Sequence, residues 1–231
     1  KGMSCHIQIS VFNGILFWMV ISLIHPLRVS YCTMLIKSLK DLLMLRVICV
    51  CTGDKFDEWY VDNLKHMVDT YSGLKYDEFV VIREDEYDGV FNKLQMFDLY
   101  RDGQNIYFDL DVIIRDDCNY LLRKDFTVCH AWWRDMWHTP LNSSIMSWEG
   151  DRSDIFNIFN KSPDQFMMEY DKGMDQYLFE QVKYKLYTQE DRYCSYQTVT
   201  VEEDYSVYIF NQRYQEMLRP DWFSKYCMPI R

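Results

Sequence analysis

Two carboxylates interrupt a hydrophobic run near the middle of this 231-residue chain, YFDLDVII at 107–114. Residues i and i+2 of a strand project to the same face, so we expect Asp109 and Asp111 to point the same way, opposite Leu110. Two ionised carboxylates this close repel each other, and burying them without partners costs free energy. A divalent cation relieves the conflict, because Mg²⁺ and Mn²⁺ take oxygen ligands from carboxylates and substrate phosphates. Asp109 and Asp111 are therefore candidate metal ligands.

A second interpretation of the pair needs no metal. One aspartate would cap the following turn, and the other would form an ion pair with Arg115 or a nearby lysine. The spacing Asp-x-Asp is common and does not choose between the two interpretations. A ligand site is favoured if the strand stops near Phe108, because open α/β sheets bind ligands at the carboxyl ends of their strands.

The segments around this pair alternate between the two periodicities of an α/β protein. Strands are expected at 45–52, 78–82, 105–114, 125–133, 141–148 and 205–210. Helices are expected at 61–71, 89–100, 151–159 and 174–184. In the second of these helices Phe91, Leu94 and Leu99 are available to pack. We therefore predict an α/β fold with a mixed, mostly parallel sheet flanked by helices.

The first 43 residues differ from the rest of the chain. Residues 2–27 contain no Asp, Glu, Lys or Arg, and ILFWMVISLI at 15–24 is almost wholly apolar. This segment could be a membrane anchor, although its most apolar part is shorter than the roughly 20 residues of a spanning helix. It could be a secretory signal, although no small-x-small cleavage site follows. It could also lie outside the mature protein, because the chain begins with Lys1. We expect a boundary after residue 43 and a catalytic domain at 44–231.

Membrane association through residues 7–27 follows from the anchor interpretation. Three flanking basic residues on the C-terminal side, Arg28, Lys37 and Lys40, would then outnumber Lys1. The positive-inside tendency would place the catalytic domain in the cytoplasm.

Composition narrows the classes of partner. The formal net charge of −10, with no basic stripe, argues against nucleic-acid binding, which depends on cationic contacts to phosphates. Eight cysteines are too few for a disulfide scaffold in a chain of this length, and none has zinc-type CxxC spacing. Cys49 and Cys51 are expected as alternate residues of one buried strand. A reducing, cytoplasmic location is the resulting prediction.

The order of five segments resembles the GT-A glycosyltransferases, in particular the family 8 and glycogenin-like nucleotide-sugar transferases. The resemblance runs from about Leu45 to Gln181. Its segments are VICVCTGDKFDEWYVDNL (47–64), FNKLQMF (91–97), YFDLDVII (107–114), LNSSIMSW (141–148) and GMDQYLFEQ (173–181). It implies a single GT-A, Rossmann-like domain in which YFDLDVII is the DxD strand.

The resemblance also implies a nucleotide site. Thr52 and Gly53 would hold the base and ribose through main-chain groups, and Tyr60 would stack on the base. Lys93 would place a positive charge near the nucleotide, and Asp109 is a further candidate nucleotide-binding residue. Each assignment has a structural alternative: Tyr60 as a core aromatic residue and Lys93 as a solvated helix residue.

A donor-sugar site follows on the same basis. Asn142 and Ser143 would hydrogen-bond the sugar hydroxyls, and the catalytic candidates Asp175 and Gln176 would meet the reacting sugar at the start of a helix. An N-cap role for Asp175 is the alternative. The three tryptophans at 132, 133 and 137 would be either an acceptor-stacking surface or core residues.

The C-terminal part departs from the family pattern. Such enzymes usually take a third metal ligand from a late His-Gly motif, but here the strand at 205–210 runs into Asn211, and no histidine follows His138. Asn211 could supply a carbonyl oxygen instead, or water could complete the shell.

Together these features predict a metal-dependent glycosyltransferase with Mn²⁺ or Mg²⁺ as cofactor. Its donor would be a nucleoside diphosphate sugar, and its acceptor an unidentified sugar, lipid or protein. One alternative is a haloacid-dehalogenase-like phosphatase, because DLDVII at 109–114 approaches that nucleophile motif. Another is a non-catalytic nucleotide-sugar-binding module. Retention or inversion at the anomeric carbon is open.

Overall fold

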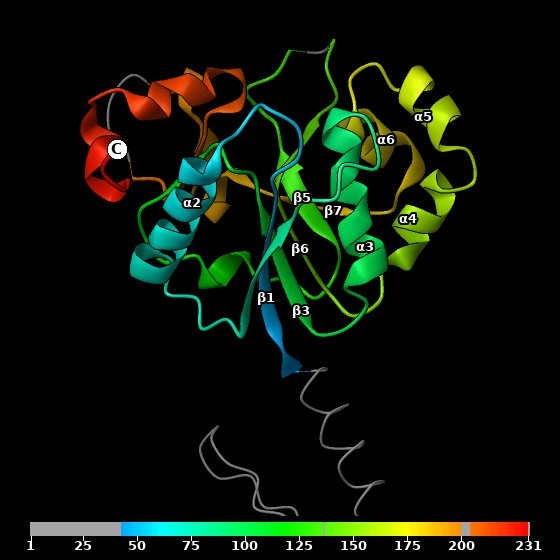
Figure 1. Cartoon of the computed structure of the whole chain (residues 1–231), viewed down its shortest axis with the longest axis horizontal. Coiled ribbons are helices and arrows are strands. Elements are labelled where there is room, and N and C mark those ends of the chain that lie inside the picture. Colours follow the sequence, from blue (N-terminus) through cyan, green and yellow to red (C-terminus); the bar gives the residue numbers. More distant parts are fainter. Residues whose placement is uncertain (1–42, 136, 200–203, 231) are drawn as a thin grey trace, which may run out of the picture. The chain divides into compact units, whose positions relative to one another are not determined.

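The computed structural model describes residues 43–135, 137–199 and 204–230 (Figure 1). Residues 1–42, on which the anchor and signal interpretations rest, lie outside this part. Within the described residues no helix combines the length and hydrophobicity that a membrane crossing needs.

A six-stranded sheet forms the centre of the fold, in the order β2-β1-β3-β6-β5-β7. Its strands are β1 (Leu45–Val50), β2 (Glu78–Ile82), β3 (Gln104–Phe108), β5 (Thr127–His130), β6 (Leu141–Glu149) and β7 (Lys185–Tyr187). Strand β6 is antiparallel to both neighbours, and the other three pairings are parallel. The predicted mixed, mostly parallel α/β sheet is confirmed.

Helices cover both faces of this sheet (Figure 1). The α-helices are α2 (Glu58–Tyr71), α3 (Gln95–Leu99), α4 (Ser153–Phe159), α5 (Pro163–Glu169) and α6 (Met174–Gln181). The 3₁₀ helices are η1 (Gly89–Leu94), η2 (Asn119–Leu121), η3 (Gln189–Asp191), η4 (Tyr196–Thr198), η5 (Asn211–Leu218) and η6 (Trp222–Tyr226). Helix α2 lies on one side of the sheet, and α3, α4 and α6 lie on the other.

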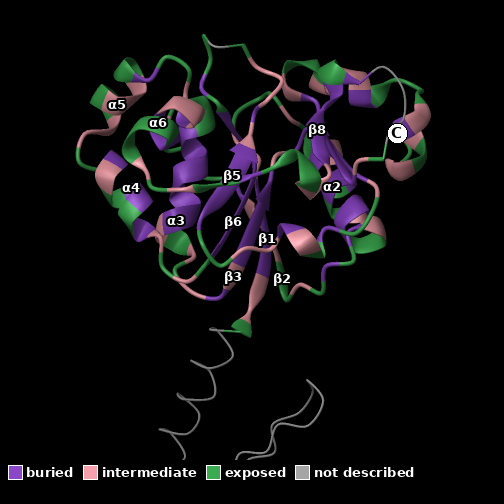
Figure 2. Ribbon diagram, turned by 180° about the vertical axis from the view of Figure 1, so that it is seen from behind, coloured by how far each residue is buried: buried purple, intermediate pink, exposed green. Residues whose placement is uncertain are grey.

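The alternation of side chains along β1 explains this two-sided packing. Val47 and Cys49 belong to the apolar cluster that includes α2, whereas Ile48 belongs to the cluster that includes α3 and α4. Successive strand residues point to opposite faces, so a continuous apolar run serves both cores. Figure 2 shows the resulting buried sheet between helices whose outer sides are exposed.

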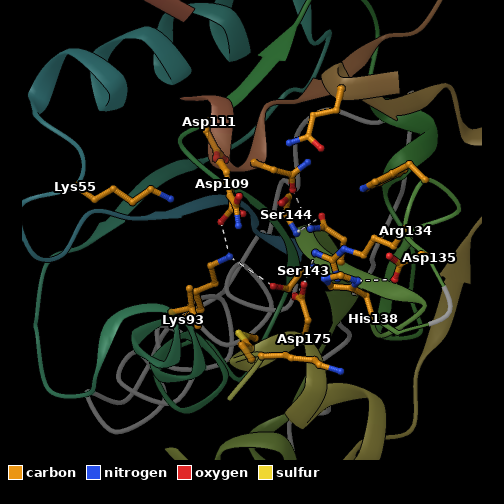
Figure 3. A pocket seen from close by; sticks show the side chains of 18 residues that line it. Lys55, Lys93, Asp109, Asp111, Arg134, Asp135, His138, Ser143, Ser144 and Asp175 are labelled. Carbon is orange, nitrogen blue, oxygen red and sulfur yellow. Dashed lines mark hydrogen bonds and ion pairs between the residues drawn. The ribbon is translucent and has the colours of Figure 1, made fainter. Parts of the chain in front are cut away.

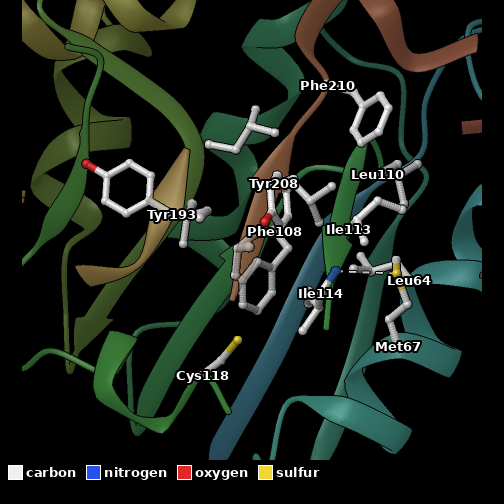
Figure 4. Close-up of a cluster of buried hydrophobic side chains, with 14 of the residues drawn as sticks. Leu64, Met67, Phe108, Leu110, Ile113, Ile114, Cys118, Tyr193, Tyr208 and Phe210 are labelled. Carbon is white, nitrogen blue, oxygen red and sulfur yellow. Dashed lines mark hydrogen bonds between the residues drawn. The ribbon is translucent and has the colours of Figure 1, made fainter. Parts of the chain in front are cut away.

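The structure contains a second, three-stranded sheet, and the prediction of one strand at 105–114 is therefore wrong. The expected single strand at 105–114 is two strands, because β3 ends at Phe108 and β4 (Val112–Ile114) joins β9 (Val207–Ile209) and β8 (Tyr193–Ser195). Ile113 and Ile114 pack in the apolar cluster beside α2 (Figure 4). The chain leaves the main sheet at Asp109 to Asp111, so a turn and not the strand pleat brings these carboxylates together.

Two predicted helices, at 89–100 and 174–184, differ from the structure near their ends, and one helix was not predicted. The segment 89–100 begins as a 3₁₀ helix, and Leu99 is 55% exposed, so it does not pack in the core. The helix from 174 stops at Gln181 because residues 185–187 extend the edge of the sheet. Helix α5 was not expected from the sequence.

Two glycines with positive φ allow a matched stability test. Gly173, the N-cap of α6, has φ +72°, and an added Cβ would lie 2.6 Å from Cγ2 of Val90. Gly53 has φ +63° and nothing within 4 Å of an added Cβ. We expect Gly53→Ala to lower the free energy of unfolding by about 1 kcal/mol through backbone strain alone. Gly173→Ala should cost at least about 1 kcal/mol more, because of the collision and because φ +72° with ψ −153° is a conformation that is nearly limited to glycine.

Urea unfolding of both variants measures this difference. Adding Val90→Ala to Gly173→Ala should recover the part of the loss that the collision causes and leave the backbone strain. Equal losses in the two single variants would contradict the role of the collision.

Candidate active site

A cavity of about 420 Å³ opens where β3 ends and β6 begins (Figure 3). Because β6 is antiparallel to β3, its first residues lie at the edge where β3 stops, and the backbone N–H of Asp109 donates to the carbonyl of Ser144 at 2.9 Å. The lining residues are Lys55, Val90, Lys93, Asp109, Asp111, Trp133, Arg134, Asp135, His138, Asn142, Ser143, Ser144, Lys172, Met174, Asp175, Gln197, Asn211 and Gln212. Seven of the eleven residues predicted from the sequence are among them.

A β-bulge shapes the floor of the cavity. Val128 of β5 pairs with Met146 of β6, but the next residue, Cys129, pairs with Asn142. Residues 143–145 therefore have no partner on β5, and a bulge of this kind redirects side chains. Ser143 and Ser144 both line the cavity as a result.

Asp109 is held as a carboxylate by a buried lysine. Its Oδ1 lies 2.5 Å from Nζ of Lys93 and accepts a hydrogen bond from the hydroxyl of Tyr107 at 2.5 Å. Burial raises the pKa of Asp109, but the Lys93 charge and the hydrogen bonds to the carboxylate more than offset this and lower the pKa below its ordinary value. Lys93 is itself only 9% exposed.

Asp111 is compensated less, because the charges of Lys55 and Lys93 lower its pKa but do not offset its burial. It is 4% exposed, and among the described residues no side chain donates a hydrogen bond to its carboxylate. Burial, and after it the negative charge of Asp109, raise the pKa of Asp111 to about 7. The two neighbouring carboxylates therefore have pKa values shifted in opposite directions.

Two asparagines that line the cavity contact each other. Nδ2 of Asn142 donates to Oδ1 of Asn211 at 3.3 Å, and Nδ2 of Asn211 donates to Oγ of Ser195 at 3.2 Å. Asn211 has φ +54°, a left-handed conformation that asparagine tolerates better than most residues. Its amide oxygen keeps a second lone pair.

Asp175 ties three segments together. Oδ1 accepts a hydrogen bond from the backbone N–H of Ser143 at 2.9 Å, and Oδ2 pairs with Nη2 of Arg134 at 2.8 Å. Nη1 of Arg134 also donates to the carbonyl of Leu141 at 2.7 Å. Asp175 is the second residue of α6, and Gly173 occupies the N-cap position, so the alternative N-cap role for Asp175 is wrong.

The arrangement fits a divalent cation. Asp109, Asp111 and Asn211 line the cavity and offer hard oxygen donors, and the carboxylate of Asp111, whose pKa is raised, would gain most from a cation. Within the described ranges no three or more His, Cys, Asp and Glu side chains group as a metal site. An ion here would therefore need further oxygen ligands from substrate or water.

Four predicted residues do not line the cavity. Tyr60 is 4% exposed, and its ring packs edge-on against Phe56, Trp59 and Tyr214. Thr52 accepts a hydrogen bond from Asn92, and Gly53 follows it on the exposed turn after β1. Gln176 hydrogen-bonds Glu180 along α6 at 2.9 Å.

The three tryptophans at 132, 133 and 137 do not form one stacking surface but lie in different environments. Trp132 packs against Trp133 and Tyr193, Trp133 lines the cavity, and Trp137 is 77% exposed.

The cavity is also lined by residues that were not predicted to have a role in the site. Lys55 was part of the predicted nucleotide segment, and its Nζ lies 4.6 Å from the ring centroid of Phe56. Arg134, Asp135 and His138 lie in the irregular connection between β5 and β6, and Lys172 precedes α6. Such loops have no periodicity from which a site could be inferred.

Comparison with solved structures supports the architecture. The apo form of the glycosyltransferase GlyE from Streptococcus pneumoniae TIGR4 matches with a TM-score of 0.52 at 12% identity, over 82% of this chain and 66% of that one. The chain shares its fold with GlyE. A glycosyltransferase involved in the glycosylation of the major capsid of PBCV-1 matches with a TM-score of 0.49 at 10% identity, over 75% of this chain and 98% of that one.

By sequence, no protein family and no curated protein matches the chain. At 12% identity the GlyE similarity shows the GT-A-like fold alone. Membership of family 8 therefore stays a prediction.

Proposed function

We propose that this protein transfers a sugar from a nucleoside diphosphate sugar to an acceptor, with the help of a divalent cation. The observation that carries the proposal is the convergence of Asp109, Asp111, Asn142 and Asp175 on one cavity at the end of β3. In an α/β sheet of this kind, that edge is where ligands bind. The glycosyltransferase fold agrees with the proposal.

The residues that line the cavity would have different roles in binding the metal and the donor. Asp109 and Asp111 would hold Mg²⁺ or Mn²⁺, which when bound would neutralise the charge on the departing diphosphate. Lys93 would keep Asp109 ionised and in place through their 2.5 Å ion pair. Asn142 and Ser143 would face the donor sugar, with Asp175 fixing the backbone of Ser143.

A panel of nucleotide sugars tested with Mn²⁺ and Mg²⁺ by thermal unfolding decides the proposal. A donor at about 100 times its Kd stabilises the folded state by about 2.7 kcal/mol, which raises Tm by roughly 5–10 °C for a chain of this size. Release of the nucleoside diphosphate would then distinguish an enzyme from a binding module. Hydrolysis of p-nitrophenyl phosphate without any donor effect would favour the phosphatase instead.

Asn211 provides a separate test of the metal shell. An amide oxygen suits Mg²⁺ as well as Mn²⁺, whereas imidazole favours Mn²⁺. We expect Mg²⁺ to support donor binding by the wild-type protein nearly as well as Mn²⁺, and Asn211→His to shift the preference towards Mn²⁺. Isothermal titration of donor with each metal measures this. An unchanged preference would place residue 211 outside the coordination shell.

A further inference from the structure

We propose that Arg134 is a positioning residue for the sugar half of the donor. This inference rests on the proposed glycosyl transfer and adds a specificity-determining residue to it. Arg134 lies in the irregular connection between β5 and β6, and it lines the cavity together with Ser143 and Asp175 (Figure 3). It acts through Asp175 on the segment that begins β6, and not on the donor itself.

The β-bulge between β5 and β6 leaves a backbone group that needs another partner. Residues 143–145 have no partner on β5, so the backbone N–H of Ser143 cannot complete the ladder there. The carboxylate of Asp175 accepts a hydrogen bond from this N–H at 2.9 Å. A side chain of α6 thus replaces a strand partner, and the position of Ser143 depends on how firmly Asp175 is held.

Arg134 holds that carboxylate from a second direction. Its Nη2 pairs with Oδ2 of Asp175 at 2.8 Å, and the two side chains are only 21% and 14% exposed. Its Nη1 donates to the carbonyl of Leu141 at 2.7 Å and to Oγ1 of Thr139 at 3.3 Å. One planar guanidinium therefore joins α6 to the first residue of β6, and its rigid fork fixes the orientation of the groups that it binds.

The same contacts continue to the carboxylates that follow β3. Nζ of Lys93 lies 3.5 Å from Oγ of Ser143 and 2.5 Å from Oδ1 of Asp109 (Figure 3). Ser143 thus contacts Lys93 through its side chain and Asp175 through its backbone. A displacement of Asn142 and Ser143 would alter the sugar contacts more than the metal site, because the ion pair with Lys93 still holds Asp109.

The contacts of Arg134 favour positioning over direct binding of phosphate. Both terminal nitrogens of its guanidinium are directed at protein acceptors. Asp175 in turn keeps acceptor capacity, because a carboxylate has about four lone-pair positions and the hydrogen bonds from Ser143 and Arg134 use two of them. A sugar hydroxyl can therefore still donate to Asp175, in the orientation that Arg134 imposes.

Binding of two ligands that differ only in the sugar provides the test. The probes are the nucleotide sugar that gives the largest thermal shift and the nucleoside diphosphate with the same base. Each is titrated calorimetrically in the presence of Mn²⁺. Arg134→Met should weaken binding of the nucleotide sugar at least about tenfold more than binding of the nucleoside diphosphate, because the contacts to the sugar are lost or misaligned.

The ratio of the two dissociation constants separates this role from others. Loss of a direct contact between Arg134 and the diphosphate would weaken both ligands equally and leave the ratio unchanged. The unpaired charge of Asp175 would repel the nucleoside diphosphate more strongly, because it is the more negatively charged of the two ligands. Such repulsion would change the ratio in the opposite direction.

Arg123→Met is the matched control. Nη2 of Arg123 pairs with Oδ1 of Asp191 at 2.6 Å, with side chains 37% and 16% exposed, and neither residue lines the cavity. We expect this variant to lower Tm by a similar amount but to change the ratio less than about twofold, because a loss of stability alone does not separate the two ligands.

A second variant tests whether Arg134 acts through Asp175. Asp175→Asn keeps an oxygen for the Ser143 N–H but loses the ion pair, so it should change the ratio in the same direction as Arg134→Met. The double variant should change the ratio no more than the larger single effect, because both changes interrupt the same set of contacts.

Arg134→Lys replaces Arg134→Met if the latter does not fold. Lysine keeps the charge but cannot reach Asp175 and the carbonyl of Leu141 together, so the ratio should still change by at least about threefold.

Two outcomes would overturn the inference. The first is a ratio for Arg134→Met, or for Arg134→Lys in its place, within about twofold of wild type. The second is a double variant whose effect is the product of the two single effects. If no nucleotide sugar raises Tm of the wild-type protein in the presence of metal, the proposed function itself fails, and the inference fails with it. Donor binding by the wild-type protein with an unchanged ratio in the variant would refute the inference alone.

Discussion

Asp111→Asn is expected to abolish metal-dependent binding of the nucleotide sugar and, at the same time, to stabilise the metal-free protein. The two effects have one cause. Asp111 is buried beside Asp109 with a pKa raised to about 7, so its charge is unfavourable until a cation arrives. A neutral amide removes both the repulsion and most of the attraction for the cation.

The direction in which stability changes with pH follows from the coupling between folding and the protonation of Asp111. An ordinary aspartate has a pKa of 3.8, so between pH 4 and pH 7 the folded protein binds more protons at Asp111 than the unfolded chain does. Stability of the wild-type protein therefore falls as pH rises through this window and levels off above pH 7. We expect Asp111→Asn to gain on the order of 2 kcal/mol at pH 8 and almost nothing at pH 4.

Urea unfolding at both pH values, without metal, measures the gain. Thermal shifts with donor and Mn²⁺ measure the loss of binding, which in the wild-type protein should strengthen up to about pH 7 because the cation displaces a proton. Asp62→Asn, on the exposed side of α2, is the matched control and should change neither quantity. Donor binding by Asp111→Asn that is as tight as wild type would refute the metal assignment.

Lys93→Met is expected to be the most destabilising single change at the site. It removes the cationic partner of a buried carboxylate and leaves that carboxylate, Asp109, beside the carboxyl group of Asp111. Breaking one side of a buried ion pair costs about 3–5 kcal/mol. The loss should be larger at pH 8 than at pH 4, because protonation of the unpaired Asp109 relieves it.

An exposed ion pair of similar length is the control. Nζ of Lys65 lies 2.6 Å from Oδ2 of Asp69, with both side chains about half exposed, so Lys65→Met should cost less than about 0.5 kcal/mol. Combining Lys93→Met with Asp109→Asn should recover most of the stability but not donor binding. A double variant as unstable as Lys93→Met alone would show that packing, and not the unpaired charge, causes the loss.

The sequence alone predicted five of the six strands of the main sheet, β1, β2, β3, β5 and β6, and their order along the chain. The continuous apolar run of β1 and the helical spacing of Val61, Leu64 and Val68 are local patterns, and they predict secondary structure because each residue is placed by its neighbours along the chain. The end of β3 at Phe108, just before Asp109, did not follow from these patterns, which predicted one continuous strand at 105–114.

Which of these residues meet was decided by tertiary structure. Asp109 and Asp111 approach through a turn that exists only because Val112 to Ile114 pair with β9 in a second sheet. Tyr60, expected at the nucleotide, lies in the core because Phe56 and Tyr214 pack around its ring.

The polar residues that line the cavity are brought together by contacts between segments that are distant in sequence. Arg134 meets Asp175 across 41 residues, and a shift in the pairing of β5 with β6 turns Ser143 towards them. His138 also lines the cavity, and it lies in the irregular loop between β5 and β6. Periodicity reports which face of an element is buried, but these contacts depend on how strands pair and where a bulge falls, and both are set by packing of the whole domain.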